Sequence, residues 1–483
     1  MSLCRMLAAL ALAGSTASTP MHAQRPDLLK PEVRQYVSVA AERVALTHVT
    51  VIDGTGAPAR TDQTVILTGK RITAVGPAAS TPVPAGATVL DLAGHTVIPG
   101  LVGVHDHMFY STPQGAIAEA LYSHPRLYLG SGVTTVRTTG AFTPYGELNL
   151  KRGIERGEVP GPRMHITAPY LISAGGNVGL DQMGMHKLET AEDGRRLVRY
   201  WAEEGAEWIK AYTQISKPIF AAVVDEAHKH GMKVTGHLCS ISFTEAVTIG
   251  IDNIEHGFRT NSDYDRSKES GICPATHFST LAALDMKDPR IMATIRLMVS
   301  KGVAMSTTTV NEQLAPGRPG PDERTLAAMA PWIAEQETIR RGKLDRGEPG
   351  GEIYPGMKEI YPRSREFELM FVKAGGMLMA GVDPAFATLA GFGDQRNLEL
   401  LVETGFTVPE AIRIMTLNGA TSLGVAKDLG TVEVGKVADL AVIQGDLIRE
   451  PAAIRRTVTV FKDGVGYDSA KLIAAVKGQV GIR

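Results

Sequence analysis

The middle of the chain, residues 99–424, repeats one local pattern: an amphipathic stretch, a glycine-containing turn and a short apolar run. In 220–228 the apolar positions follow helical spacing, and after the turn at 229–231 comes the strand-like run KVTGH. Helix, turn and buried strand in repetition indicate parallel β/α units. About eight such units fit, so we predict an α/β fold with a (β/α)8 barrel over 99–424. A doubly wound sheet uses the same units and is the alternative.

Both ends of the chain read differently. Residues 40–98 and 425–470 are short β-rich runs that alternate apolar and polar residues and are broken by glycine turns. Two such ends around one middle predict a small composite β-sandwich domain built from both. Residues 312–365 interrupt the barrel pattern with proline, glycine and charge, and we interpret them as an inserted lid-like segment.

The balance of charged residues bears on which binding partners the protein is expected to have. The 483 residues include 50 lysines and arginines against 51 aspartates and glutamates, a formal net charge of −1. This balance gives no reason to expect nucleic acid or an anionic membrane surface as a partner. With 44% apolar and 21% charged residues, the composition is that of a folded globular protein. Assembly into a homo-oligomer stays open.

Residues 1–23 have the layout of a secretory signal peptide, with Arg5, a short apolar run at 7–13 and a small, polar stretch behind it. The run is too short to cross a bilayer, and no later stretch is long and apolar enough to do so. We therefore expect a periplasmic or secreted protein. Export leaves Cys239 and Cys273 in an oxidising compartment, where a disulfide and two free buried thiols are the alternatives.

Six polar residues close predicted strands in the middle of the chain. His105 and His107 are two apart in VGVHDH, so both imidazoles point to the same face of an extended strand. The other four each end an apolar run: Lys210 in AEWIKAY, His237 in KVTGH, His256 in IDNIEH and Asp383 in MLMAGVD. Because the C-terminal ends of barrel strands converge on one mouth, we expect all six to share one site.

Taken singly, each of these residues has an ordinary explanation. A strand-end histidine is more often a hydrogen-bonded core residue than a metal ligand. A buried lysine is most often paired with a carboxylate, and Glu207 is close to Lys210 in sequence. Asp383 precedes Pro384 and is placed to begin a turn. The functional interpretation depends on the coincidence of all six at strand ends.

With these residues in place, the chain resembles the amidohydrolase superfamily, and within it the imidazolonepropionase-like and the prolidase-like (Xaa-Pro or Xaa-Arg dipeptidase-type) hydrolases. VIPGLVGVHDH is similar to the family's first-strand signature, and NGATSLGVAKDLGTVEVGKVADLAVI is similar to its C-terminal signature. The resemblance covers Val44 to Asp463. It implies a barrel beside a composite β-sandwich, in agreement with the two β-rich ends.

The resemblance implies two divalent metal ions, with zinc as the expected metal. Carried over residue by residue, it assigns His105, His107 and Asp383 to the first metal, His237 and His256 to the second, and Lys210, as a carbamate formed with CO2, to both. Imidazole and oxygen ligands suit zinc. The family mechanism implies a metal-bridging hydroxide that attacks a carbonyl carbon. Asp383 passes the proton to the leaving amine, so Asp383 and Lys210 are the expected catalytic residues.

Lys210 also separates branches of the family. Members with one metal, including imidazolonepropionase itself and many ring deaminases, resemble this chain at the histidines but lack the lysine. The resemblance therefore favours hydrolysis of a C–N amide bond in a small-molecule substrate, a dipeptide or N-acyl amino acid. The alternatives are a lactonase or cyclic-amide hydrolase at the same site, a mononuclear imidazolonepropionase- or deaminase-type hydrolase, and an inactive barrel that only binds a metal or ligand.

Three residues are candidate substrate contacts. Tyr212 is two residues beyond Lys210, so its side chain faces the same way. Arg137, in GVTTVRTTG, lies near another strand end, where it is placed to bind a carboxylate or to form a structural ion pair. Asn177 lies in LISAGGNVG, which resembles a family loop in which many relatives carry a histidine. That difference makes a dipeptidase assignment copied from relatives unsafe.

Overall fold

The computed structural model describes residues 26–112, 115–173, 184–307 and 314–482. The predicted signal peptide, residues 1–23, and Asn177 lie outside these ranges. Within them, no helix combines the length and the apolar character that crossing a membrane requires.

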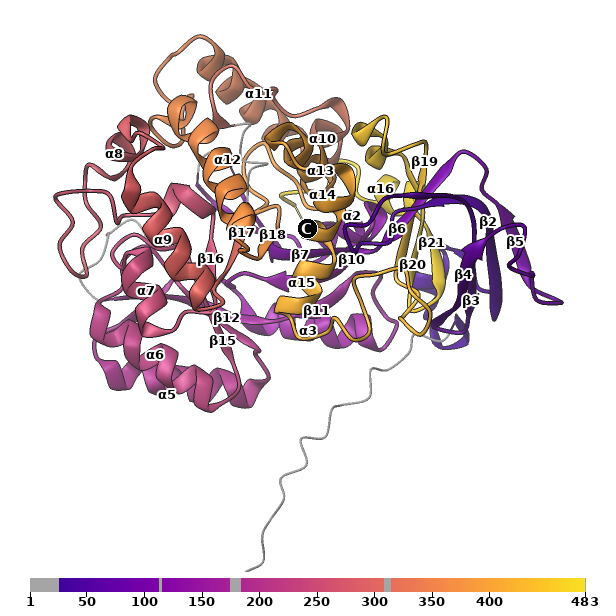
Figure 1. The fold of residues 1–483 in the computed structure, drawn as a ribbon. Coiled ribbons are helices and arrows are strands. Elements are labelled where there is room, and N and C mark those ends of the chain that lie inside the picture. The colour runs from indigo at the N-terminus through magenta and orange to yellow at the C-terminus, as the bar shows by residue number, and fades with distance from the viewer. Residues whose placement is uncertain (1–25, 113–114, 174–183, 308–313, 483) are drawn as a thin grey trace, which may run out of the picture.

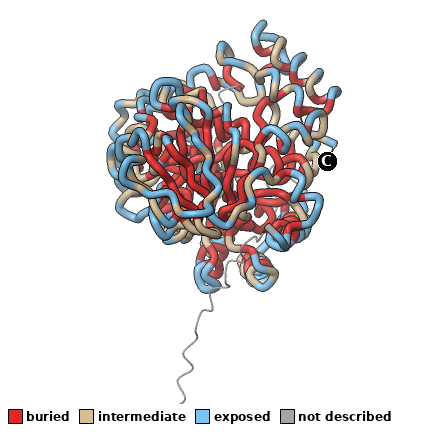
Figure 2. Tube along the Cα trace, turned by 90° about the vertical axis from the view of Figure 1, so that its right-hand side faces the viewer, coloured by how far each residue is buried: buried red, intermediate tan, exposed pale blue. Residues whose placement is uncertain are grey.

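Parallel strands form the centre of the molecule, surrounded by helices (Figure 1). One ladder has the order β11-β10-β7 and another the order β13-β12-β14-β15-β16-β17-β18. The strands are β7 (Leu101–Asp106), β10 (Val133–Thr138), β11 (Arg163–His165), β12 (Thr167–Ser173), β13 (His186–Leu188), β14 (Trp208–Ala211), β15 (Lys233–Gly236), β16 (Asn253–Glu255), β17 (Ala304–Thr307) and β18 (Leu378–Ala380). They are buried almost throughout, and exposed residues gather on the outer helices (Figure 2).

The two ladders meet at both ends, although no continuous hydrogen-bonded ring joins them in the described residues. Only Ile166 separates β11 from β12, and there Thr167 N donates to Thr138 Oγ1 on β10. On the opposite side, Asp383 N, just after β18, donates to His105 O on β7 at 2.8 Å. The arrangement is barrel-like, and complete closure into an eight-stranded ring stays a prediction.

Local sequence signals define the helices between the strands. A capping box of Thr190 and Asp193 begins α5, and Gly205 (φ 94°) ends it in a left-handed conformation that turns the chain into β14. Between β7 and β18, the described residues contain the helices α2 (Ser123–Gly130), α3 (Pro144–Glu155), α5 (Ala191–Glu204), α6 (Lys217–Lys229), α7 (Phe243–Ile249), η2 (Gly257–Thr260), α8 (His277–Ala283), α9 (Pro289–Ser300), α10 (Glu323–Ala328), α11 (Pro331–Asp345) and α12 (Met357–Lys373). After β18 come α13 (Phe392–Thr404), α14 (Val408–Met415) and α15 (Leu417–Ser422).

Strands from both ends of the chain form one nine-stranded sheet, seen in Figure 1 as indigo and yellow strands side by side. Its order is β1-β21-β20-β19-β6-β2-β3-β4, and β5 pairs with β2. Its strands are β1 (Val37–Val39), β2 (Arg43–Val51), β3 (Arg60–Thr68), β4 (Arg71–Pro77), β5 (Thr88–Asp91), β6 (His95–Pro99), β19 (Leu440–Gln444), β20 (Thr457–Lys462) and β21 (Val465–Asp468). The two ends thus assemble together, while a two-layer sandwich stays a prediction.

Two further elements bear on the site. The described part of the predicted insertion contains α10, α11 and the beginning of α12. Cys239, two residues after His237, forms a disulfide with Cys273. This pairing decides between the two alternatives for the thiols and attaches the segment after β15 to the segment before α8.

Candidate metal centre

The six strand-end residues line one cavity: His105, His107, Lys210, His237, His256 and Asp383. They come from the ends of β7, β14, β15, β16 and β18, so the parallel strands deliver them to the same mouth. The structure therefore brings together the whole predicted set. Their roles as metal ligands remain predictions.

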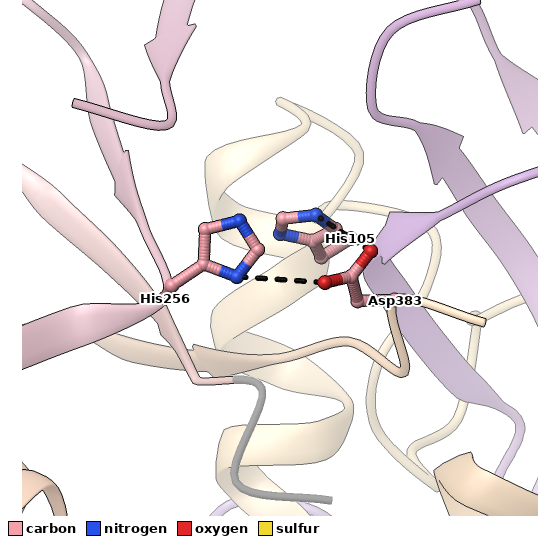
Figure 3. A group of neighbouring side chains, drawn as sticks. All are labelled: His105, His256 and Asp383. Carbon is pink, nitrogen blue, oxygen red and sulfur yellow. Dashed lines mark ion pairs between the residues drawn. The ribbon is translucent and has the colours of Figure 1, made fainter. Parts of the chain in front are cut away.

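Asp383 is the central acceptor of the cluster. Its Oδ1 lies 3.2 Å from His107 Nε2 and 3.6 Å from His105 Nε2, and its Oδ2 lies 3.6 Å from His256 Nδ1. Figure 3 shows the His105 and His256 rings turned toward this carboxylate. Burial on its own raises the pKa of Asp383, but His105 and His107 outweigh it and hold the pKa well below its usual range. The carboxylate is therefore ionised at neutral pH.

Backbone conformation helps to aim two of these side chains. His256 and Asp383 both follow their strands with positive φ, 64° and 48°. Non-glycine residues rarely adopt this region, and such strain gathers at functional sites. At His256 the left-handed residue ends the alternation of the strand, so that Glu255 and His256 both contact residues inside the barrel.

Three imidazoles of the cluster, those of His105, His237 and His256, are neutral. Burial lowers the pKa of His105 to about 4 and places the pKa values of His237 and His256 well below the usual range. His237 packs on His256, with ring centroids 4.3 Å apart. Neutral imidazole is the form that binds a metal ion.

Glu255 lies behind the cluster and orients His105. His105 Nδ1 donates to Glu255 Oε2 at 2.6 Å, and both side chains are fully buried. This bond leaves the Nε2 lone pair of His105 directed toward Asp383. Four more side chains donate to Glu255: Arg137 (2.5 Å), Thr235, Asn253 (2.8 Å) and Ser306.

Lys210 is buried, 1% exposed, and its Nζ has no hydrogen-bond partner within the described part of the chain. Glu207, the carboxylate considered from sequence, instead pairs with Lys151 and His165. Burial lowers the pKa of Lys210 to about 8. Because an unpartnered buried ammonium is costly, this environment suits a lysine that carries another group, as a carbamate does. With the neutral imidazoles and Asp383, the donor set fits divalent zinc.

The predicted substrate contacts differ in placement. Tyr212 lines the cavity next to His237, with ring centroids 4.7 Å apart. Arg137 is fully buried, pairs with Glu255 and lies over the Trp208 ring, which is the structural ion pair left open from sequence. Asn177 lies outside the described residues.

The fold brings further aromatic residues to the cavity. Tyr170 is a candidate from sequence, whereas Phe109, Phe142 and Tyr354 were missed. Phe109, Phe142 and Tyr170 form an aromatic wall with Tyr212, with centroid distances of 4.8 Å between Phe109 and Phe142 and 5.1 Å between Phe142 and Tyr170. Tyr354, from the predicted insertion, lines the cavity too. No local pattern marks the missed residues, because they come from separate loops and strands.

The amidohydrolase family matches residues 96–320 and 370–466, which include all six residues of the cluster. The chain belongs to the amidohydrolase family. The match is interrupted at 321–369, within a region that overlaps the predicted insertion. Among curated amidohydrolase relatives, the imidazolonepropionase of Maricaulis maris is 45% identical over 73 residues, 14% of this chain and 18% of that protein. A 5-methylthioadenosine/S-adenosylhomocysteine deaminase of Moorella thermoacetica is 39% identical over 90 residues, 16% of this chain and 20% of that protein.

Solved structures match over far more of the chain. A Xaa-Pro dipeptidase with methionine bound in its active site is 20% identical, with 88% of this chain and 100% of that chain covered and a TM-score of 0.66. A putative prolidase from Bifidobacterium longum is 24% identical, with coverage of 90% and 99% and a TM-score of 0.63. At these identities the likeness establishes the amidohydrolase fold alone.

Proposed function

We propose that this protein is a metal-dependent amidohydrolase that cleaves a C–N amide or peptide bond in a dipeptide or N-acyl amino acid. The observation that carries the proposal is the convergence of the six strand-end residues on one cavity around an unpartnered buried lysine. Membership of the amidohydrolase family supports it. The wide structural likeness to a Xaa-Pro dipeptidase agrees with it.

The residues present fit two metal ions. We assign His105, His107 and Asp383 to one, His237 and His256 to the other, and Lys210 as a carbamate to both. When bound, two divalent cations would lower the pKa of a water molecule and so supply a nucleophile at neutral pH.

The chain's own residues supply proton transfer and orientation. Asp383 is ionised and central, so its carboxylate can take a proton at Oδ and return it to the leaving amine. Tyr212 and Tyr170 stay protonated because burial raises the pKa of both phenols. Their hydroxyls are therefore available as donors to a substrate oxygen. The aromatic wall excludes water from that side of the cavity.

One second candidate has its own support. The curated relatives with local identity are imidazolonepropionases and a deaminase, which favours mononuclear hydrolysis of a ring substrate. Lys210 argues against it, because a single metal leaves the buried ammonium unpartnered. A lactonase or cyclic-amide hydrolase would use the same residues as the main proposal, and a catalytically inactive barrel would hold metal without turnover.

The experiment is the metal content per chain of wild type and Lys210→Ala, both purified without chelator and measured by elemental analysis. We expect about two divalent metals in the wild type and a steep loss in the variant. Lys233→Ala is the matched control, because its half-buried amine donates to Ser422 O away from the cavity. Its metal content should equal that of the wild type.

About one metal in all three proteins would refute the carbamate bridge and favour the mononuclear candidate. If the wild type binds two metals, a panel of dipeptides, N-acyl amino acids and lactones then identifies the bond cleaved. Bound metal without turnover of any of these would favour the inactive barrel.

Two finer features belong to the same proposal. We infer that the parallel strands close into an eight-stranded barrel, which the hydrogen bond between Asp383 N and His105 O supports, and that the composite sheet forms a sandwich.

We also infer export to the periplasm or medium, because a Cys239–Cys273 disulfide suits an oxidising compartment. Sequencing the N-terminus of the mature protein tests the export.

A further inference from the structure

Arg259 is a buried cation beside the candidate metal centre. It lies on η2, directly after β16, and its side chain is 6% exposed. Its guanidinium carbon is 4.9 Å from the centroid of the Tyr354 ring, and its Nη2 lies 2.9 Å from His256 Nδ1. His277 Nε2, 2.8 Å from Arg259 O, holds the backbone of the short helix. Both Tyr354 and His256 line the cavity, so Arg259 lies directly behind two of its lining residues.

Among the described residues, Arg259 has no carboxylate within ion-pair distance, a property that it shares with the buried Arg126, which lies over the Tyr122 ring away from the cavity. Arg137 pairs with Glu255, and Arg340 pairs with Glu337. Arg259 Nη1 is buried and has no hydrogen-bond partner in the described part of the chain. A buried charge is costly unless it is paired and hydrogen-bonded. The position therefore calls for an anionic group from outside the described protein.

The contact with His256 reinforces this argument. A neutral imidazole nitrogen has one lone pair, so His256 Nδ1 accepts from Arg259 or binds a metal ion, but not both. Metal ligation through that nitrogen leaves Nη2 without its acceptor as well. Two neighbouring guanidinium nitrogens without acceptors match the two oxygens of a carboxylate.

The rest of the cavity is of a different kind. Phe109, Phe142, Tyr170 and Tyr212 form its aromatic wall, which has no charged side chain. With Lys210 assigned to the metal ions, a cavity flanked by the Arg259 cation and by one aromatic wall selects a substrate that is charged at one end and apolar at the other.

Resting on the proposed function, we propose that Arg259 binds the free carboxylate of the substrate and that the enzyme prefers N-acyl amino acids or dipeptides carrying that carboxylate together with an apolar group. Arg259 is then a specificity-determining residue. Arg137, the arginine considered from sequence, is already neutralised by Glu255.

The test compares one hydrolysed N-acyl amino acid with its C-terminal carboxamide, which has nearly the same shape but lacks the negative charge and one acceptor oxygen. The metal-loaded wild type should prefer the acid by about 10- to 100-fold in kcat/KM. Arg259→Gln should raise KM for the acid by a similar factor and change KM for the carboxamide by less than about threefold. Arg259→Lys should recover part of the lost preference for the acid. The metal content of both Arg259 variants should equal that of the wild type. Arg290→Gln, which removes a guanidinium over Tyr264 outside the cavity, is the control and should alter neither substrate.

Equal use of acid and carboxamide by the wild type would overturn the proposal. Equal damage to both substrates in Arg259→Gln, or loss of metal, would do so too, because Arg259 would then act by positioning His256. Failure of the proposed function is a separate result, namely no turnover of any amide. In that case, binding of L-phenylalanine and of L-phenylalaninamide is measured by calorimetry. Binding of the acid alone that is lost in Arg259→Gln supports the carboxylate site. No binding of the acid refutes it.

Discussion

Glu255 is the residue on which the geometry of the candidate metal centre depends. It accepts hydrogen bonds from side chains on β7, β10, β15 and β17 as well as from Asn253 on its own strand. Burial on its own raises the pKa of Glu255, but Lys210, Arg137 and His105 hold it well below the usual range. A permanently ionised carboxylate behind a ligand histidine fixes the tautomer of the ring and increases its basicity.

Glu255→Gln should therefore weaken metal binding. The amide keeps the shape but removes the charge that orients His105 and neutralises Arg137, so we expect affinity for zinc to fall by about 10- to 100-fold. Competition with a chromophoric chelator measures it. Glu368→Gln is the matched control. Glu368 is another fully buried glutamate, and within the described residues it forms no ion pair with the cluster, so the variant should bind zinc as the wild type does. Unchanged affinity in Glu255→Gln would contradict the orienting role.

Glu368 on α12 should make the stability of the folded protein depend on pH. Burial raises its pKa to about 8. Between about pH 4.5 and 8 the folded protein keeps a proton that the unfolded chain has lost, so this group makes stability fall as pH rises. Glu368→Gln removes the titration. The free energy of unfolding of the variant minus that of the wild type should therefore be larger at pH 8 than at pH 5, by on the order of 1–3 kcal/mol.

Thermal or denaturant unfolding at the two pH values measures this difference. Glu335→Gln on α11 is the exposed control. The prediction fails if the stability difference between Glu368→Gln and wild type is the same at pH 5 and pH 8.

Among the elements, the approach of β18 to β7 places Asp383 beside His105. Gly381, just after β18, donates to Thr307 O at 3.2 Å and accepts from Asn397 Nδ2 at 3.0 Å. A Cβ at this position would overlap the backbone and the Cβ of His105. The absence of a side chain is thus what allows the two strand ends to meet.

Gly381→Ala should separate these strand ends. We expect a loss of about 1–3 kcal/mol in the free energy of unfolding, as for overpacking, together with weaker metal binding because Asp383 moves from His105. Gly342→Ala, in the last turn of α11, is the matched control. A Cβ there meets only the far end of the Arg346 side chain, so this change should be neutral or stabilising by about 0.5–1 kcal/mol. Wild-type stability and metal affinity in Gly381→Ala would refute the close approach.

For the whole molecule, Arg163 on β11 connects the barrel to the composite sheet. Its guanidinium binds Asp439 at 2.8 Å and Asp463 at 3.0 Å, and both carboxylates are almost fully buried. Asp463 also donates its backbone N–H to Asp439 Oδ1. One arginine thus neutralises two acidic residues from the C-terminal half of the sheet.

Arg163→Gln should loosen the attachment of the sheet. Removing the partner of a buried ion pair leaves uncompensated charge and costs about 3–5 kcal/mol. Arg156→Gln, whose pair with Glu158 is exposed, should leave the free energy of unfolding nearly unchanged. Chemical denaturation of both variants gives the comparison, and similar small losses in the two would show that the buried network does not stabilise the attachment.

The sequence by itself determined the elements and the strand-end residues of this protein. Helical spacing, capping residues and glycine turns act within a few residues of one another, so they place His105, Lys210 and His237 at strand ends without knowledge of the rest of the chain. Tertiary structure alone decided which partners those residues meet. His105 and Glu255 are 150 residues apart, and Arg259 reaches Tyr354 from the predicted insertion. Such contacts depend on how distant strands converge in space, and no local periodicity records that convergence.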